Sequence, residues 1–299
     1  MIGKQLAQFA ALRRGESSPG GMRRIAIHEI EAALRYLRRG HVNDAAVHGA
    51  RRALKKALAA LRLLRSAAGG KRLEWILRTL QDISRPLGVV RDSKVLLECL
   101  DALPGGRRGG PALLSFRTSL QRARRRLHRG LTPSVIALES ARLRACAARL
   151  RRLRLSDDSW DSIEPELQRA YGGARRAMRQ VGTDSDGRHK WRKRAKVVRY
   201  QLGFLEPLWP PVLKTLESQL HRLTDCLGED HDLSLLRAKL LEDPGFNSPA
   251  QRPALLRLIE RRRHTLQRNA LALGLRIFGE KPHRFSARLR AYWRAWSRQ

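Results

Sequence analysis

Acidic side chains are scarce in this chain of 299 residues, which has 27 Asp and Glu residues against 62 Lys and Arg residues. The cations comprise 51 Arg and 11 Lys, and the net charge is +35. Because so large a charge makes the compact state repel itself, a polyanionic partner would stabilise it. Arginine binds phosphate in a bidentate manner, so its excess over lysine favours a phosphate-containing partner. A GC-rich genome would explain the arginine excess equally well, but not the net charge.

Aromatic residues, cysteines and long apolar runs are also few. Aromatics make up 5% of the chain, which argues against a protein that stacks many bases on its surface. The three cysteines, Cys99, Cys146 and Cys226, are far apart and form no metal or redox motif, which indicates a reducing, cytoplasmic location. No uncharged run exceeds nine residues, so no membrane span is expected. Residues 1–22 are expected to form a flexible lead-in and not a secretion signal.

Apolar residues recur with helical periodicity along the whole chain, and no segment alternates like a strand. The sequence therefore predicts an all-α fold. Clusters of Gly, Pro and Asp predict breaks between helices at residues 15–21, 67–71, 103–111, 155–165, 182–187, 208–211, 243–253 and 279–283.

The chain contains an internal repeat. The segment from His48 to Lys55 reappears from His189 to Lys196 at an offset of 141, and Leu87–Asp92 reappears as Leu227–Asp232 at an offset of 140. Pro-Ala-Leu-Leu at 111–114 recurs at 253–256. These ordered matches predict two copies of one helical unit, at residues 23–155 and 163–298, with an acidic linker at 156–162. Each copy has enough helices for a four-helix bundle.

The repeated segment combines a cationic stripe with an apolar stripe. Residues advance about 100° around a helix, so residues spaced three or four apart share a face. The cationic stripes comprise His48, Arg51, Lys55 and Arg62, flanked by Arg52 and Lys56, and then His189, Arg192, Lys196 and Arg199. The apolar stripes, predicted to face the core, comprise Val47, Leu54, Leu58 and Leu61, and then Trp191, Ala195, Val198 and Leu202.

The first cationic stripe has no acidic residue near it in sequence, since none occurs between positions 45 and 73. Like charges on one helix face destabilise the helix slightly, so an unmixed stripe favours an anion-binding face over a merely solvated one. Both histidines begin such a stripe, and we expect them to donate hydrogen bonds to phosphate. Neither has a partner at zinc-ligand spacing, so no metal site is expected.

Two further features are assigned structural roles. Gly88 and Gly228 are predicted to end helices, with Asp92 and Asp232 opening the next ones. The acidic segment 225–232 has the composition of a cation site, but helix capping by Asp232 is the favoured interpretation. No Walker loop, GxSxG or HExxH motif occurs, so neither a catalytic site nor a cofactor is predicted.

These motifs resemble the CHAD domain, the conserved histidine α-helical domain. The resemblance rests on HxxRxxxK in both copies, on Arg199-Tyr200, and on the two LGxx(R/H)D segments. It implies two four-helix bundles related by pseudo-two-fold symmetry, with basic faces lining a shared groove or pore. It also implies non-catalytic binding of inorganic polyphosphate at polyphosphate granules. Leu58 and Val197 depart from the pattern, where family members usually carry cations.

The leading hypothesis is therefore a non-enzymatic module that binds inorganic polyphosphate. Cations upstream of each stripe repeat at the same offset and are included in the predicted site. That site comprises His48, Arg51, Arg52, Lys55, Arg62, Arg35, Arg38, His189, Arg192, Lys193, Lys196, Arg199, Arg176 and Arg179. A nucleic-acid or nucleoid protein is the second hypothesis, because a basic face suits any phosphate backbone. A structural protein of storage granules, anchored by its N-terminus or by Tyr292, Trp293 and Trp296, is the third.

Overall fold

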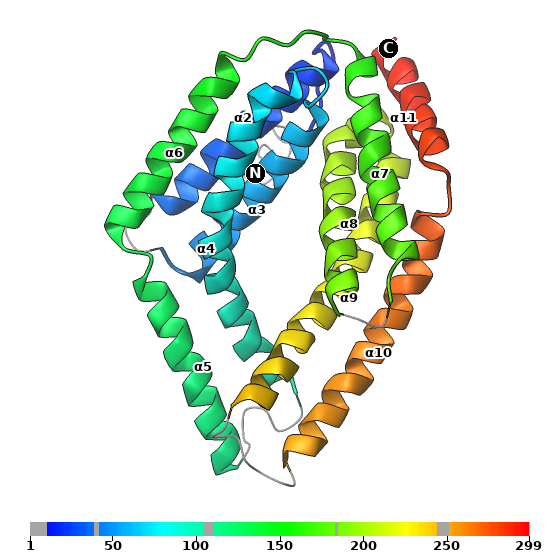
Figure 1. Ribbon diagram of the computed structural model, residues 1–299. Coiled ribbons are helices and arrows are strands. Elements are labelled where there is room, and N and C mark those ends of the chain that lie inside the picture. Colours follow the sequence, from blue (N-terminus) through cyan, green and yellow to red (C-terminus); the bar gives the residue numbers. More distant parts are fainter. Residues whose placement is uncertain (1–10, 39–41, 104–109, 183–184, 244–250, 299) are drawn as a thin grey trace.

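The computed structural model describes residues 11–38, 42–103, 110–182, 185–243 and 251–298, and across these ranges the chain is helical, without a strand (Figure 1). The prediction of an all-α fold is confirmed. The α-helices are α2 Ser18–Leu37, α3 Asp44–Leu63, α4 Gly70–Ala102, α5 Pro111–Arg129, α6 Pro133–Arg151, α7 Glu164–Arg179, α8 Ser185–Leu205, α9 Pro210–Glu242, α10 Gln251–Ile277 and α11 Pro282–Ser297. Two 3-10 turns, Trp160–Ser162 and Glu206–Leu208, precede α7 and α9.

The order of helices repeats once along the chain. Among the described residues, α2–α6 form the first half and α7–α11 the second, so each half has five α-helices. The predicted four-helix bundles are therefore not confirmed. In the first half, a break that the sequence did not predict separates α5 from α6 at Gly130–Thr132. There the Thr132 hydroxyl accepts a hydrogen bond from the backbone N–H of Val135, and Pro133 starts α6. The break in the second half falls at the predicted residues 279–283.

The repeated segments occupy equivalent places in the two halves. His48 is the fifth residue of α3, and His189 is the fifth residue of α8. The start of α3 is fixed by Asn43, whose side chain accepts a hydrogen bond of 2.9 Å from the N–H of Ala46. All eight residues of the two predicted apolar stripes are buried, as expected.

The two halves share one hydrophobic core. Residues of α2, α3 and α4 belong to the same buried cluster as residues of α7, α8 and α9. In this interface the Gln201 amide donates a hydrogen bond of 3.3 Å to the carbonyl oxygen of Ala59. A smaller cluster, containing Leu100, Phe116, Leu236 and Ile259, joins the far ends of α4 and α9 to α5 and α10. Both buried clusters thus contain residues from the two halves and hold the halves together.

Some predicted breaks and boundaries differ from the structure. The predicted break at 15–21 ends early, because Ser17 caps α2 through the N–H of Gly20. Within the predicted lead-in, Leu12 is buried and its N–H donates a hydrogen bond of 2.8 Å to the carbonyl oxygen of Phe204. Residues 1–10 lie outside the described residues, as do parts of the predicted breaks at 103–111, 182–187 and 243–253. The linker is also packed, since Trp160 is buried within it.

Candidate anion-binding site

Helices α3 and α8 face each other between the two halves, while α4 and α9 converge beside them (Figure 1). Their cationic stripes line two cavities. The first cavity, of about 590 Å³, lies between the start of α3 and the end of α8, and its lining includes His48, Arg52, Lys56 and Arg199. The second cavity, of about 620 Å³, lies at the opposite ends of these helices and is lined by Arg62, His189 and Lys193. Two equivalent sites therefore result from the repeat.

The two cavities meet at a shared set of side chains, which we call the central cluster. Six residues line both cavities: Arg51, Lys55, Asp92, Arg192, Lys196 and Tyr200. Four of these six are cations, and they come in equal number from α3 and α8. An anion in either cavity would therefore contact cations from both halves of the chain.

The charges of the central cluster are crowded and partly buried. Burial, followed by repulsion from Arg51, Lys196 and Arg192, lowers the pKa of Lys55 to about 7. Burial, followed by repulsion from Arg192, lowers the pKa of Lys196 to about 8. Burial also lowers the pKa of Arg51, with Asp92 opposing this shift. The empty cluster thus disfavours its own charged state, and a bound polyanion would reverse that effect.

Close packing against two glycines positions the arginines of the cluster. A Cβ on Gly88 would lie 2.1 Å from Nη1 of Arg51, and a Cβ on Gly228 would lie 3.2 Å from Nη2 of Arg192. The prediction that these glycines end helices is wrong, because α4 and α9 continue through them. Their small size leaves room for a guanidinium from the neighbouring helix. Asp92 and Asp232 consequently lie within helices and do not cap them.

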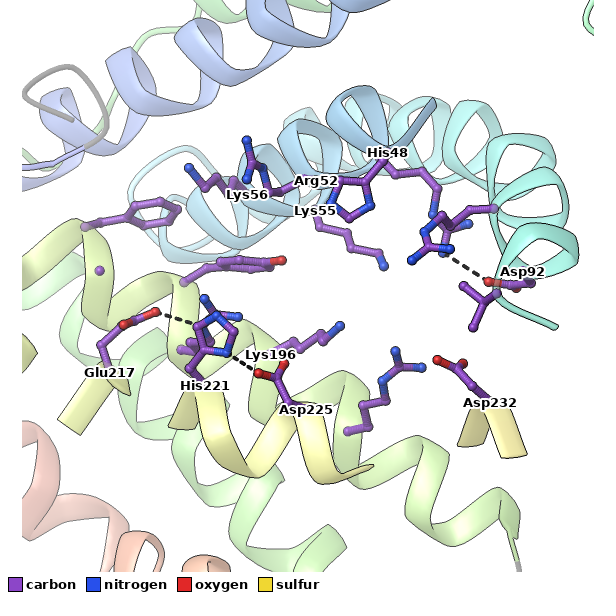
Figure 2. A pocket seen from close by; sticks show the side chains of 18 of the residues that line it. His48, Arg52, Lys55, Lys56, Asp92, Lys196, Glu217, His221, Asp225 and Asp232 are labelled. Atoms are coloured by element: carbon purple, nitrogen blue, oxygen red, sulfur yellow. Dashed lines mark hydrogen bonds and ion pairs between the residues drawn. The ribbon is translucent and has the colours of Figure 1, made fainter. Parts of the chain in front are cut away.

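Asp92 and Asp232 are equivalent in the repeat and face each other across the cluster (Figure 2). Nη2 of Arg51 lies 4.0 Å from Oδ1 of Asp92. The pKa of Asp232 is raised, chiefly by burial and with a contribution from Asp92, while Arg192 opposes the shift. Asp92 thus lies beside Arg51 without neutralising the cluster, which has four cations to one shared carboxylate.

The two stripe histidines differ in their surroundings. His48 is exposed at the first cavity, and its pKa is lowered by burial and by Arg91. His189 stacks on His231 at 4.0 Å between ring centroids, and burial together with His231 lowers its pKa to about 4. Nδ1 of His189 is buried without a hydrogen-bond partner. A neutral imidazole at neutral pH offers one N–H donor, in keeping with the predicted hydrogen bond to phosphate.

Most of the predicted site residues are brought together by the fold. His48, Arg51, Arg52, Lys55, Arg62, His189, Arg192, Lys193, Lys196 and Arg199 line one or both cavities. Arg176 is exposed and lines a groove that adjoins the second cavity. Arg35, Arg38 and Arg179 are exposed and line neither cavity, because they lie on the outer faces of α2 and α7.

The sequence prediction missed the contribution of α4 and α9. Arg91, Glu217, His221 and Asp225 line the first cavity, and Arg85 lines the second. Figure 2 shows Glu217, His221 and Asp225 along α9, opposite the residues of α3. Glu217 accepts a hydrogen bond of 2.7 Å from Nε of Arg199, and Nδ1 of His221 lies 2.6 Å from Asp225. The repeated LGxx(R/H)D segments were the available signal, since they lie next to these residues.

One carboxylate of the acidic segment 225–232 is paired within the protein. Within the acidic segment 225–232, Asp230 is buried and pairs with Arg188 at 2.9 Å and Arg263 at 3.1 Å. Its charge is therefore matched by protein cations. Across the described residues, no group of three or more His, Cys, Asp and Glu side chains is placed to hold a metal ion.

The aromatic residues of the C-terminal helix pack against the protein. Trp296 is buried, and Trp293 stacks on Trp160 at 5.5 Å. Tyr292 contacts the edge of Trp209. These side chains thus take part in the packing of the fold, and the hypothesis that they anchor the chain to a storage granule stays a prediction. No described helix has the length and apolar character needed to cross a membrane.

Residues 24–241 match the family model of the CHAD domain, and the chain therefore belongs to the CHAD domain family. This family is associated with polyphosphate binding. No curated protein matches the chain by sequence.

Two solved structures resemble the fold. The CHAD domain from the plant Ricinus communis is 20% identical, with a TM-score of 0.60 over 91% of this chain and 95% of that chain. PptA from Streptomyces chartreusis is 17% identical, with a TM-score of 0.60 over 95% of this chain and 100% of that chain. At these identities the similarity establishes the fold alone.

Proposed function

We propose that this protein binds inorganic polyphosphate without hydrolysing it, using the central cluster and the two cavities beside it. The observation that carries the proposal is the convergence of Arg51 and Lys55 with Arg192 and Lys196, from two halves of the chain, at cavities lined by further cations. Charge-assisted hydrogen bonds to phosphate oxygens are stronger than neutral ones, and guanidinium groups form them in pairs.

The electrostatics of the central cluster support an anionic ligand. Lys55 and Lys196 have lowered pKa values because they are buried among other cations. A polyanion between α3 and α8 would remove this repulsion and would give each cation a partner. Binding would thereby stabilise the folded state through the same groups that destabilise it when the site is empty.

Binding without catalysis is the simpler role for these residues. The charged groups at the central cluster are mainly cations, and its one shared carboxylate, Asp92, lies beside Arg51. Hydrolysis of phosphoanhydrides by metal-dependent enzymes uses carboxylates or histidines that hold one or two metal ions. We extend the proposal to association with polyphosphate granules, for which multivalent binding to long chains would suffice.

A competition experiment tests the proposal. The protein is bound to immobilised long-chain polyphosphate and challenged with free polyphosphate, DNA, RNA and orthophosphate at equal phosphate concentration. We expect polyphosphate to displace the protein at the lowest concentration, because a slender linear chain can enter the cavities between the helices. Displacement by DNA or RNA at equal or lower concentration would instead support the nucleic-acid hypothesis.

Salt titration of the same complex tests the electrostatic mechanism. Cations that neutralise phosphates release the counterions of the polyanion, so the affinity should fall steeply as salt is added, as it does for nucleic acids. An affinity that does not change with salt would contradict the mechanism.

A further inference from the structure

The two cavities occupy equivalent positions in the repeat but differ strongly in charge. The first cavity is lined by five carboxylates, those of Asp92, Glu206, Glu217, Asp225 and Asp232. The second cavity is lined by one, that of Asp92. The central cluster therefore has one mixed-charge end and one almost purely cationic end.

Equivalent positions in the repeat account for this difference. At the offset of 140 that relates α9 to α4, Asp225 corresponds to Arg85, and Glu217 to Leu77. At the offset of 141 that relates the end of α8 to the end of α3, Glu206 corresponds to Arg65. In all three cases the carboxylate lines the first cavity. The equivalent residue is a cation or an apolar residue that lines the second cavity, as Arg85 does, or the groove beside it, as Arg65 and Leu77 do.

A basic groove continues from the second cavity, and we call it the exit groove. It shares Arg62, Gln81, Lys193 and Val197 with the second cavity and runs between α3, α4, α7 and α8. Its cations are Arg62, Arg65, Arg169, Arg176, Lys193 and Arg194.

The two carboxylates of the exit groove are already paired. Glu74 lies 2.9 Å from Nε of Arg78 and 3.4 Å from Arg65. Glu166 pairs with Arg169 and accepts a hydrogen bond of 2.8 Å from the Ser66 hydroxyl. Among the described residues, Arg62, Arg176 and Lys193 form no ion pair with a carboxylate, so their charges face the groove unmatched.

We infer that polyphosphate held at the central cluster leaves the protein on one side, along the exit groove, and that this groove is a second binding segment for long chains. The inference rests on the proposed function. The five carboxylates of the first cavity offset more than half of the charge of its eight Lys and Arg side chains. The second cavity has one carboxylate against seven Lys and Arg side chains, and it continues into the exit groove, which offers six cations. Bound polyphosphate would therefore extend from the central cluster through the second cavity and not through the first, although the two halves of the chain are nearly symmetric.

The length of the polyphosphate distinguishes binding at the central cluster from binding along the exit groove. Tripolyphosphate is short enough to be held by the central cluster alone, whereas a long chain would also occupy the exit groove. Each additional phosphate contact adds counterion release, so the salt dependence should be steeper for the long chain.

The test is the double variant Arg65→Glu with Arg176→Glu, compared with the charge-matched double variant Arg257→Glu with Arg268→Glu. Arg257 and Arg268 are exposed on α10, and neither lines a cavity described above nor the exit groove. Both double variants change the net charge equally, so the long-range effect of charge is common to them. Affinities for tripolyphosphate and long-chain polyphosphate are measured by calorimetric titration, and folding is checked by thermal melting.

We expect the exit-groove variant to bind long-chain polyphosphate at least about tenfold more weakly than the control variant. Its salt dependence should become shallower by about one unit of logarithmic slope for each lost contact. Tripolyphosphate should bind both variants equally. Equal affinity of both variants for the long chain would overturn the inference and leave the proposed function standing. If the wild-type protein bound neither anion, the proposed function would itself be refuted.

Discussion

The guanidinium group of Arg51 lies against Gly88 so closely that a Cβ at position 88 would be 2.1 Å from its Nη1 atom. Arg192 and Gly228 repeat this arrangement in the second half, with a closest approach of 3.2 Å. The absence of a side chain on one helix thus allows the cation of the next helix to reach the central cluster. This contact couples the repeated motif of α3 and α8 to that of α4 and α9.

Alanine at either glycine should weaken polyphosphate binding and preserve the fold. Gly88→Ala forces Arg51 to move, while Gly228→Ala requires a smaller shift of Arg192, so the first variant should lose more affinity. Both positions lie inside helices, where alanine is about 1 kcal/mol more favourable than glycine. Calorimetric titration with polyphosphate and thermal melting check both effects. A Gly88→Ala variant that binds as tightly as the wild type would show that the position of Arg51 is unimportant.

Polyphosphate binding should take up protons near neutral pH. Burial, followed by repulsion from neighbouring cations, lowers the pKa of Lys55 to about 7 and that of Lys196 to about 8, and a bound polyanion favours their charged forms. The groups facing them are Arg51, Arg192, Arg199, Asp92, Asp225 and Asp232. The affinity for long chains, whose interior phosphates remain ionised, should therefore fall as the pH rises from about 7 to about 9. Titrations in buffers of different ionisation enthalpy measure the uptake directly.

The variant Lys55→Met provides the control for this prediction. It should bind polyphosphate more weakly and take up fewer protons than the wild type. In the wild type without ligand, the lowered pKa of Lys55 means that the unfolded chain binds more protons above pH 7, so the stability should rise with pH from about 7 toward 10. Unchanged proton uptake in Lys55→Met would assign the effect to other groups.

The protein should release no phosphate from polyphosphate, tripolyphosphate or ATP in the presence of Mg²⁺ or Mn²⁺. The reason is that the central cluster consists mainly of cations. Among the described residues, no group of three or more His, Cys, Asp and Glu side chains is placed to hold the metal ions that such hydrolysis uses. A colorimetric phosphate assay against a matched blank checks this expectation. Release that disappears when Arg51 and Arg192 are both replaced by methionine would contradict it.

The sequence predicted the parts of the site that depend on helical periodicity. Leu54 and Trp191 are buried and Arg51 and Arg192 line the cavities, because residue spacing determines the face on which each side chain lies. The repeat also predicted that α3 and α8 would be equivalent. Arg35 and Arg38 repeat at the same offset yet lie outside the cavities, since an equivalent position does not determine which face points inward.

The role of Gly88 and Gly228 within α4 and α9 could not be derived from local sequence. Gly88 and Gly228 resemble helix ends, and only the approach of an arginine from another helix explains them as interior residues. The difference in charge between the two cavities likewise depends on Glu206 and Asp225, which line the first cavity together with residues of α3 and α4 that are distant in sequence. Such contacts are tertiary, so they become visible only when the helices are placed together.

The most direct test of the central claim is calorimetric titration of long-chain polyphosphate into the wild type, the variants Arg51→Met and Arg192→Met, and the double variant. A lost hydrogen bond to a charged group costs about 1.5–3 kcal/mol, and about 1.4 kcal/mol corresponds to a factor of ten in affinity. Each single variant should therefore bind at least about tenfold more weakly, and the double variant at least about a hundredfold more weakly. All variants should remain folded, as judged by thermal melting. Near-wild-type affinity in the folded double variant would contradict the claim that the central cluster binds the polyanion.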